Sequence, residues 1–386
     1  MLVKREISQT ISRLAKKYPV ITITGPRQSG KTTLCKNLFV NKKYFNLEAP
    51  DIRNYAAEDP RSFLNDCKKG AIIDEIQRLP DLLSYIQAEV DEKKKPGQFI
   101  VTGSQNFQLL NSVSQSLAGR TALLTLLPFS LSEIKTDKKK SLDNILYKGL
   151  FPRIYDHDLN PTEAMSYYVN TYIEKDLRSL INVKDLMAFE TFLKLCAGRT
   201  GQVLNFSSLG NDCGVSHNTI KEWISILEAS YIIKLLRPYY KNYGKRLIKS
   251  AKLYFLDTGL AAFLLGIQNE TQVESHPLKG ALFETLIISE LLKSKFNSNK
   301  SDNLYFFRDH KGNEIDVIFD QGMDVSILEI KSGQTINNDF FKNIKYFRNL
   351  NSNMKNSYLV YGGSESRTQF DVKITPWREV HLIRDM

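Results

Sequence analysis

The sequence predicts an α/β protein whose first region is a parallel β-sheet with covering helices. Apolar runs at residues 20–23, 71–73 and 98–102 have the length of buried strands, and helical patterns separate them up to about residue 130. Such alternation is typical of βαβ units, in which crossover helices cover parallel strands. Short runs at 45–47 and 121–126 are expected to add two more strands to this sheet.

The first apolar run leads into residues 25–32, GPRQSGKT, which match the pattern G-x-x-x-x-G-K-[S/T] at every fixed position. In such a loop the backbone N–H groups curl around a phosphate chain, and the following helix adds the positive charge of its N-terminus. We expect Lys31 to reach the β- and γ-phosphates of ATP and the Thr32 hydroxyl to ligate Mg²⁺. The predicted nucleotide-binding residues are Gly25, Pro26, Arg27, Gln28, Ser29, Gly30, Lys31, Thr32 and Thr33.

Polar residues follow the next two apolar runs. Asp74 is expected to hold the Mg²⁺ through its water shell, and Glu75 to orient and deprotonate the attacking water. Ser104 and Gln105 lie where the γ-phosphate or that water would be contacted. Helix capping is the alternative explanation for these residues, but their combination with the upstream glycine-rich loop favours an ATP-hydrolysing site.

Composition and charge indicate the class of protein that carries this site. The 42% hydrophobic and 25% charged residues are typical of a globular protein, and the net charge of +11 favours a polyanionic partner. The four cysteines form no C-x-x-C pair and are expected to be free thiols. The N-terminus is charged, with an amphipathic helix expected over 1–18, and no apolar run has the length of a membrane span. We expect a cytoplasmic protein without membrane contact.

A winged helix, which is a DNA-binding motif, is predicted in the second half of the chain. A short helix from residue 206, a tight turn and a helix over 217–227 precede strand-like runs at 231–236 and 252–255. The hairpin is basic and carries interleaved tyrosines, so we expect it to track a phosphate backbone. A solvated basic hairpin used for subunit packing is the alternative. The candidate DNA-binding residues are Lys234, Arg237, Lys241, Lys245, Arg246, Lys249 and Lys252.

A second candidate site lies near the C-terminus. Strands around 315–318 and 326–331 carry Asp316, Glu329 and Lys331 among apolar neighbours, and Glu284 lies on a preceding helix. We expect Asp316 and Glu329 to converge on a divalent metal, with Lys331 and Glu284 completing a catalytic set. This arrangement resembles the PD-(D/E)XK nuclease fold. The alternative is a solvent-facing strand with a surface Glu–Lys pair.

The whole chain resembles the AAA+ ATP-binding proteins of bacteria and archaea that carry a C-terminal domain of uncharacterised function. The shared motifs are residues 25–34, 73–77, 102–104, 117–120, 127–130, 279–284, 313–316 and 329–333. The resemblance implies a homo-oligomer in which a neighbouring subunit supplies an arginine to the phosphoryl group. The candidates for that arginine are Arg120, Arg153 and Arg178.

These observations predict four regions along the 386 residues. They are an ATPase core over 1–134, a helical lid or linker over 135–200, a winged helix over 201–268 and a nuclease-like domain over 269–386. The predicted function is Mg²⁺-dependent ATP hydrolysis coupled to action on DNA, with a candidate nuclease site. A nucleotide-gated regulatory ATPase with an inert nuclease-like scaffold is the alternative.

Overall fold

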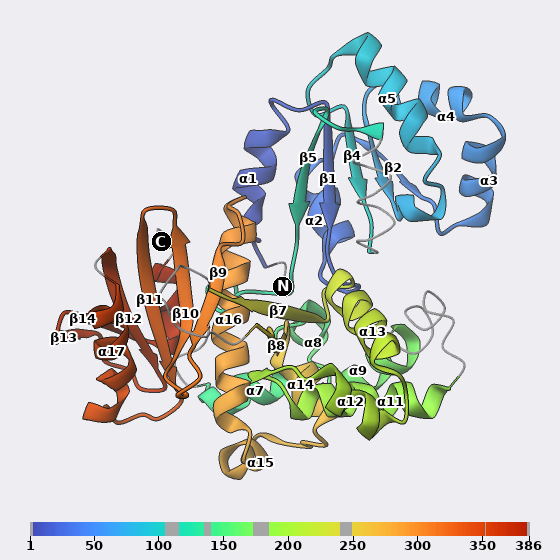
Figure 1. Cartoon of the computed structure of the whole chain (residues 1–386). Coiled ribbons are helices and arrows are strands. Elements are labelled where there is room, and N and C mark those ends of the chain that lie inside the picture. Colours follow the sequence, from blue (N-terminus) through green and yellow to red (C-terminus); the bar gives the residue numbers. More distant parts are fainter. Residues whose placement is uncertain are drawn as a thin grey trace.

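A computed structural model describes residues 3–104, 116–134, 140–172, 185–239, 249–351 and 353–383. Two sheets organise these residues (Figure 1). The first has five strands in the order β2-β3-β4-β1-β5, all of them parallel. Its strands are β1 (Val20–Thr24), β2 (Lys43–Asn46), β3 (Ala71–Asp74), β4 (Phe99–Thr102) and β5 (Thr121–Thr125).

Helices cover both faces of this sheet, as its continuous apolar strands predict. Alternate strand residues divide between two cores: Ile21 and Ile23 pack with one set of helices, and Val20 packs with the other. The first face is covered by α1 (Ile7–Leu14) and α2 (Lys31–Leu38). The second is covered by α3 (Pro50–Glu58), α4 (Pro60–Asp66) and α5 (Leu82–Lys93), and the 3₁₀ helix η1 (Ile76–Arg78) follows β3. The predicted parallel α/β core is confirmed.

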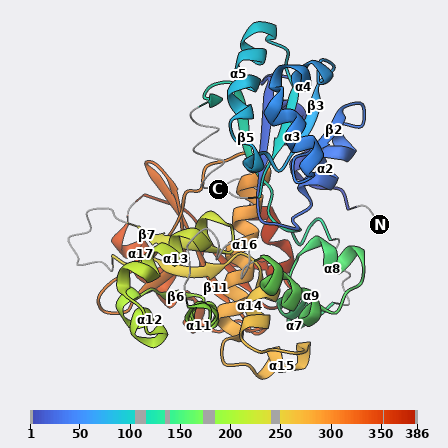
Figure 2. The same ribbon diagram turned by 90° about the vertical axis from the view of Figure 1, so that its right-hand side faces the viewer.

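A helical layer lies below this sheet in Figures 1 and 2. It comprises α7 (Leu142–Lys148), α8 (Pro152–Asp156), α9 (Pro161–Tyr168), α11 (Leu186–Gly198), α12 (Phe206–Cys213), α13 (His217–Ala229), α14 (Thr258–Leu264) and α15 (Glu270–Ser275). Side-chain caps from Asn205 and Ser216 begin α12 and α13, and Gly214 ends α12 at a φ of 69°. This turn between the two helices lies where the sequence predicts it.

The second sheet has nine strands in the order β13-β14-β12-β11-β10-β9-β7-β8-β6. They are β6 (Gln202–Val203), β7 (Ile233–Pro238), β8 (Lys252–Phe255), β9 (Leu304–Arg308), β10 (Glu314–Gln321), β11 (Asp324–Lys331), β12 (Met354–Tyr361), β13 (Arg367–Gln369) and β14 (Val372–Pro376). The long helix α16 (Lys279–Asn297) packs against β8 and β11, and α17 (Lys342–Leu350) against β10. The 3₁₀ helices η3 (Asn338–Phe341) and η4 (Trp377–Ile383) complete this region.

The β7–β8 hairpin is therefore part of a larger sheet. Arg237 and Pro238 of β7 pair in parallel with Tyr305 and Phe306 of β9, so both edges of β7 are occupied. A free-standing wing would leave one of those edges open. This pairing joins the predicted winged-helix and nuclease-like regions through one continuous sheet.

Candidate active site

The glycine-rich loop has the backbone geometry that its sequence requires. Gly25 follows β1 at a φ of 144°, and a Cβ there would lie 2.1 Å from the Leu126 carbonyl oxygen, so only glycine fits. Gly30 has a φ of 92° and immediately precedes α2. The loop thus wraps the N-terminus of α2, where partial positive charge favours an anion.

Lys31 is buried and turned back onto its own loop. Its ammonium group donates to the carbonyl oxygens of Gly25, at 2.9 Å, and of Pro26, at 2.8 Å. Burial lowers the pKa of Lys31 to about 8, although the carboxylates of Glu75 and Asp74 act in the opposite direction. The nearby Ser29 hydroxyl is fully buried and finds no hydrogen-bond partner among the described residues. These polar groups fit a phosphate chain.

Three hydroxyl groups surround Asp74 at the carboxyl end of β3. Its Oδ2 accepts from Thr32, at 2.7 Å, and from Tyr44, at 2.8 Å, while its Oδ1 accepts from Thr102. The Thr32 hydroxyl and the Asp74 carboxylate are hard oxygen ligands that fit Mg²⁺. Burial, together with the Asp74 carboxylate, raises the pKa of Tyr44, so that its hydroxyl stays a donor. Tyr44 lies on β2 and carries no motif signal.

Glu75 directly follows β3 in a left-handed conformation, with a φ of 57°. Its Oε2 accepts from the Ser104 hydroxyl, at 3.1 Å, and from the Gln77 amide. Gln77 also donates to Ser104, at 3.1 Å. The structure therefore brings together the predicted residues Glu75 and Ser104 and adds Gln77, whereas Gln105 lies outside the described residues.

A cavity of about 390 Å³ opens in front of the loop. Arg153, near the start of α8, lines it together with loop residues of the same chain. Arg120 instead forms two hydrogen bonds with Asp91, at 2.6 and 2.8 Å, and Arg178 lies outside the described residues. The cavity is lined by Arg27, Gln28, Gly30, Lys31, Thr32, Thr33, Glu48, Glu75, Pro152, Arg153, Asp156 and His157.

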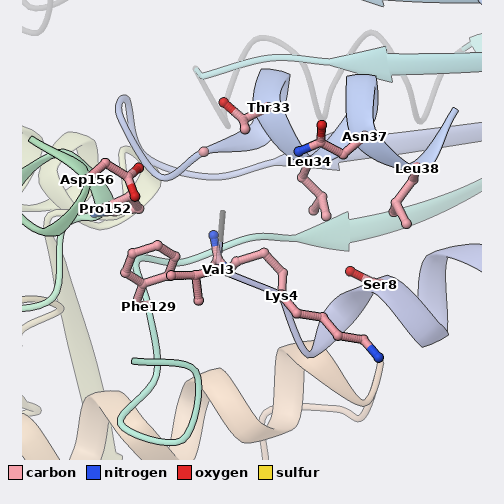
Figure 3. A pocket seen from close by; sticks show the side chains of 12 residues that line it. Val3, Lys4, Ser8, Thr33, Leu34, Asn37, Leu38, Phe129, Pro152 and Asp156 are labelled. Atoms are coloured by element: carbon pink, nitrogen blue, oxygen red, sulfur yellow. The ribbon is translucent and has the colours of Figure 1, made fainter. Parts of the chain in front are cut away.

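A second cavity of about 370 Å³ adjoins the first and is more apolar (Figure 3). Figure 3 shows α2 on one side, the N-terminal segment and Phe129 below, and Pro152 with Asp156 at one end. The two cavities share Gly30, Thr33, Pro152 and Asp156. The apolar part of the lining comes from Val3, Leu34, Leu38, Phe129 and Pro152.

Arg5 fixes the N-terminal segment against the phosphate loop. Its guanidinium group is buried and donates to the carbonyl oxygens of Ser29, at 2.7 Å, and Leu127, at 2.6 Å. It also pairs with Glu133 at 3.0 Å. Four partners at three places in the chain hold this arginine in the lining of the apolar cavity, a role that no local pattern indicates.

The predicted C-terminal residues also come together. Antiparallel pairing of Val317 with Leu328 places Asp316 beside Glu329. The Lys331 ammonium group lies 2.8 Å from Glu329 Oε1 and 3.9 Å from Asp316 Oδ2. Burial, and then repulsion by Asp316, raise the pKa of Glu329 to about 8.

A second lysine completes this cluster. Glu284 of α16 accepts from the Tyr254 hydroxyl at 3.1 Å, and burial together with Asp316 raises the pKa of Glu284 to about 7. The ammonium group of Lys252 forms an ion pair with Glu314 and lies 3.9 Å from Glu284 Oε2. Across the described ranges, no group of three or more His, Cys, Asp or Glu side chains is arranged to hold a metal ion. Among the described residues Glu329 Oε2 is buried without a partner, and the two ammonium groups lie beside the carboxylates of this cluster.

The basic hairpin is only partly available to a ligand. The structure contradicts the prediction for Lys252, because this residue is buried and its ammonium group is held by Glu314. Lys234 pairs with Asp302 at 2.5 Å, whereas Arg237 and Lys249 are exposed. The remaining candidates lie outside the described residues: Lys241, Lys245 and Arg246.

One contact links this hairpin to the phosphate loop. The Tyr231 hydroxyl lies 2.8 Å from the hydroxyl of Thr24 and 3.3 Å from that of Thr125. Thr24 is the last residue of β1, directly before Gly25, and Tyr231 lies between α13 and β7. The connection between α13 and β7 is thus hydrogen-bonded to the end of the strand that leads into the phosphate loop.

Three family models match successive parts of the chain. Residues 17–135 match an AAA domain, and residues 139–271 and 279–380 match two domains of unknown function, DUF8612 and DUF4143. The region that carries the loop, Asp74 and Glu75 is therefore similar to AAA-type P-loop ATPases in both sequence and α/β fold.

Two mycobacterial proteins and two solved structures are similar to larger parts of the chain. Uncharacterised proteins of Mycobacterium tuberculosis and Mycobacterium bovis are each 28% identical over 323 residues, which cover 82% of this chain and 71% of theirs. A Walker-type ATPase of Pyrococcus abyssi is 15% identical with a TM-score of 0.45, covering 68% of this chain and 96% of its own. DnaA of Aquifex aeolicus, solved with AMPPCP, is 15% identical with a TM-score of 0.31, covering 57% and 85%.

In the part of the chain that the structure describes, no helix combines the length and the apolar character needed to cross a membrane.

Proposed function

We propose that this protein is a Mg²⁺-dependent ATPase that couples hydrolysis to action on DNA. The observation that carries the proposal is the convergence of Lys31, Thr32, Asp74, Glu75 and Ser104 at one end of the parallel sheet. These residue types are the ones that phosphoryl transfer to water requires: a cation, oxygen ligands for a metal, a base and a polar orienting group. When bound, Mg²⁺ would supply positive charge to the β- and γ-phosphate oxygens.

The chain's own residues then divide the work. Lys31 exchanges its bonds to loop carbonyls for bonds to phosphate, because a charged acceptor forms the stronger hydrogen bond. The Glu75 carboxylate releases its hydrogen bond from Gln77 and then accepts the proton of the attacking water, while Ser104 orients that water. Arg153 approaches the phosphates from α8 of the same chain, which makes it a cis-acting cation. The apolar cavity beside the loop accommodates the base.

DNA is the proposed polyanionic partner because of the net charge of +11 and the α12–turn–α13 segment. The exposed face of α13 offers His217, Asn218 and Lys221, which are able to contact bases and phosphates. The hydrogen bond between Tyr231 and Thr24 joins the connection that directly follows α13 to the strand that leads into the phosphate loop. We infer from it that DNA at α13 alters the rate of ATP hydrolysis.

ATP turnover with and without DNA tests this coupling. We expect double- or single-stranded DNA to raise turnover, and DNA affinity to fall with salt at a log–log slope near −5 if about six phosphates are neutralised. Lys221→Ala should weaken DNA binding and reduce the slope by about one, whereas Lys194→Ala, on α11, should not. A protein that hydrolyses ATP with no stimulation and no salt-sensitive DNA binding would fit the alternative, a nucleotide-gated regulatory ATPase.

For the C-terminal cluster, the same geometry favours an inert nuclease-like scaffold over a nuclease. Lys252 and Lys331 already compensate Glu314, Asp316 and Glu329, so the donor set does not fit a divalent metal. We therefore expect no Mg²⁺- or Mn²⁺-dependent nicking of plasmid DNA. Nicking by the wild-type protein that Asp316→Ala and Lys331→Ala both abolish would reverse this assignment.

A further inference from the structure

Asp156 lies where the two cavities meet. It is one of four residues that line both the polar cavity at the phosphate loop and the apolar cavity beside it, and it is the only acidic residue of the apolar one. Figure 3 places Asp156 beside Pro152, across the apolar cavity from Thr33 and Asn37 of α2. A nucleotide that fills both cavities has its sugar at this junction, between the phosphates and the base.

The acids around the nucleotide cavity differ in their partners. Glu48 pairs with Arg27, at 3.3 Å, and Glu75 accepts from Gln77 and Ser104. Within the described ranges, the exposed carboxylate of Asp156 has no hydrogen-bond or ion-pair partner. A carboxylate is repelled by phosphate and, as an acceptor-only group, pairs with donors; at the junction between the phosphates and the base, the donors of a nucleotide are the hydroxyls of the sugar.

We propose that Asp156 recognises the 2′- and 3′-hydroxyls of the ribose and makes this site selective for ribonucleoside over deoxyribonucleoside triphosphates. The proposal rests on the proposed ATP-binding function of the same cavity. A site built to pair with a sugar hydroxyl discriminates against the analogue that lacks it, because the partner group loses its hydrogen bond. Since Asp156 is exposed at the rim, we expect a modest preference for ATP over 2′-deoxy-ATP, of about 3- to 10-fold.

Binding of ATP and 2′-deoxy-ATP to the full chain tests the proposal, measured by calorimetry with Mg²⁺ present. The readout is the ratio of the two affinities, because removal of a negative charge close to a triphosphate strengthens the binding of both nucleotides. In Asp156→Ala the ratio should fall to about 1. Asp156→Asn, which retains an amide oxygen as an acceptor, should keep part of the preference.

Asp158→Asn is the matched control, because Asp158 is fully exposed, lies two residues away and lines neither cavity. This variant should keep the wild-type ratio. Equal affinities of the wild-type protein for the two nucleotides, or an unchanged preference in Asp156→Ala, would overturn the inference and leave the ATPase proposal intact. Failure of the wild-type protein to bind either nucleotide would overturn both.

Discussion

Replacing Lys252 by methionine should destabilise the protein strongly, although Lys252 belongs to a basic hairpin. Its side chain is 3% exposed, and its ammonium group forms an ion pair with Glu314 and lies 3.9 Å from Glu284. Removal of one partner from a buried ion pair costs roughly 3–5 kcal/mol, because the other charge stays buried and uncompensated. Glu314 is 21% exposed and keeps an ion pair with Arg308 at 3.5 Å, so at most the lower end, about 3 kcal/mol, applies. For a cooperative unit of about 150–250 residues, 1 kcal/mol shifts the melting temperature by about 2–4 °C, so we expect it to fall by roughly 6–12 °C.

Thermal unfolding followed by circular dichroism measures this change. Lys249→Met, three residues away on an exposed position, is the matched control and should melt within about 1 °C of the wild-type protein. The double variant Lys252→Met/Glu314→Gln should recover part of the loss, since the carboxylate that Lys252 compensates is then replaced by a neutral amide. A melting temperature of Lys252→Met equal to that of Lys249→Met would refute the burial argument and return Lys252 to the solvent-facing residues.

Three further predictions concern the nucleotide site. Tyr44→Phe removes a donor to Asp74 and should raise the Mg²⁺ concentration for half-maximal ATP turnover by about 3- to 10-fold. Tyr55→Phe should not, because its hydroxyl bonds Asp66 and it lines neither cavity. Arg153→Ala should lower ATP turnover by at least about tenfold, because Arg153 lines the nucleotide cavity. Arg120→Ala should leave turnover unchanged, because Arg120 is engaged by Asp91. Loss of turnover in Arg120→Ala but not in Arg153→Ala would identify Arg120 as an arginine that acts on a neighbouring subunit. The pKa of Lys31 is lowered to about 8, and the charged form binds phosphate, so ATP affinity measured by calorimetry should be full below pH 8 and fall as the pH rises above it; equal affinity at pH 7 and pH 9 would contradict this.

The parts of the nucleotide site that local sequence determines were predictable. Residues 25–32 need glycines at particular backbone angles and a helix directly after them, and the local sequence predicts both. Asp74 and Glu75 follow from the same logic, because the carboxyl ends of parallel strands meet at one edge of the sheet. Tyr44 and Gln77 were not predictable, since each is one polar residue whose partner is fixed only by tertiary packing.

Long-range pairing explains why the prediction for Lys252 failed. β7 pairs with β9 across a wide sequence separation, which a local apolar pattern cannot indicate. That pairing, with β6 on the other side of β8, encloses the hairpin, so all four residues of β8 are buried. A count of basic residues along the chain treats Lys249 and Lys252 as equivalent, although only Lys249 is exposed. Basic residues on a strand indicate a ligand-binding surface only when one face of that strand is exposed to solvent.

ATP binding and hydrolysis by Glu75→Gln test the central claim most directly. Glutamine has the shape of glutamate and an amide oxygen that can still accept from Gln77 and Ser104, but it cannot act as a base. The account predicts wild-type affinity for ATP with Mg²⁺ and a turnover lowered by about 100-fold or more, while Lys31→Ala loses binding itself. A Glu75→Gln protein that hydrolyses ATP within about twofold of the wild-type rate, or a wild-type protein without Mg²⁺-dependent turnover, would contradict it.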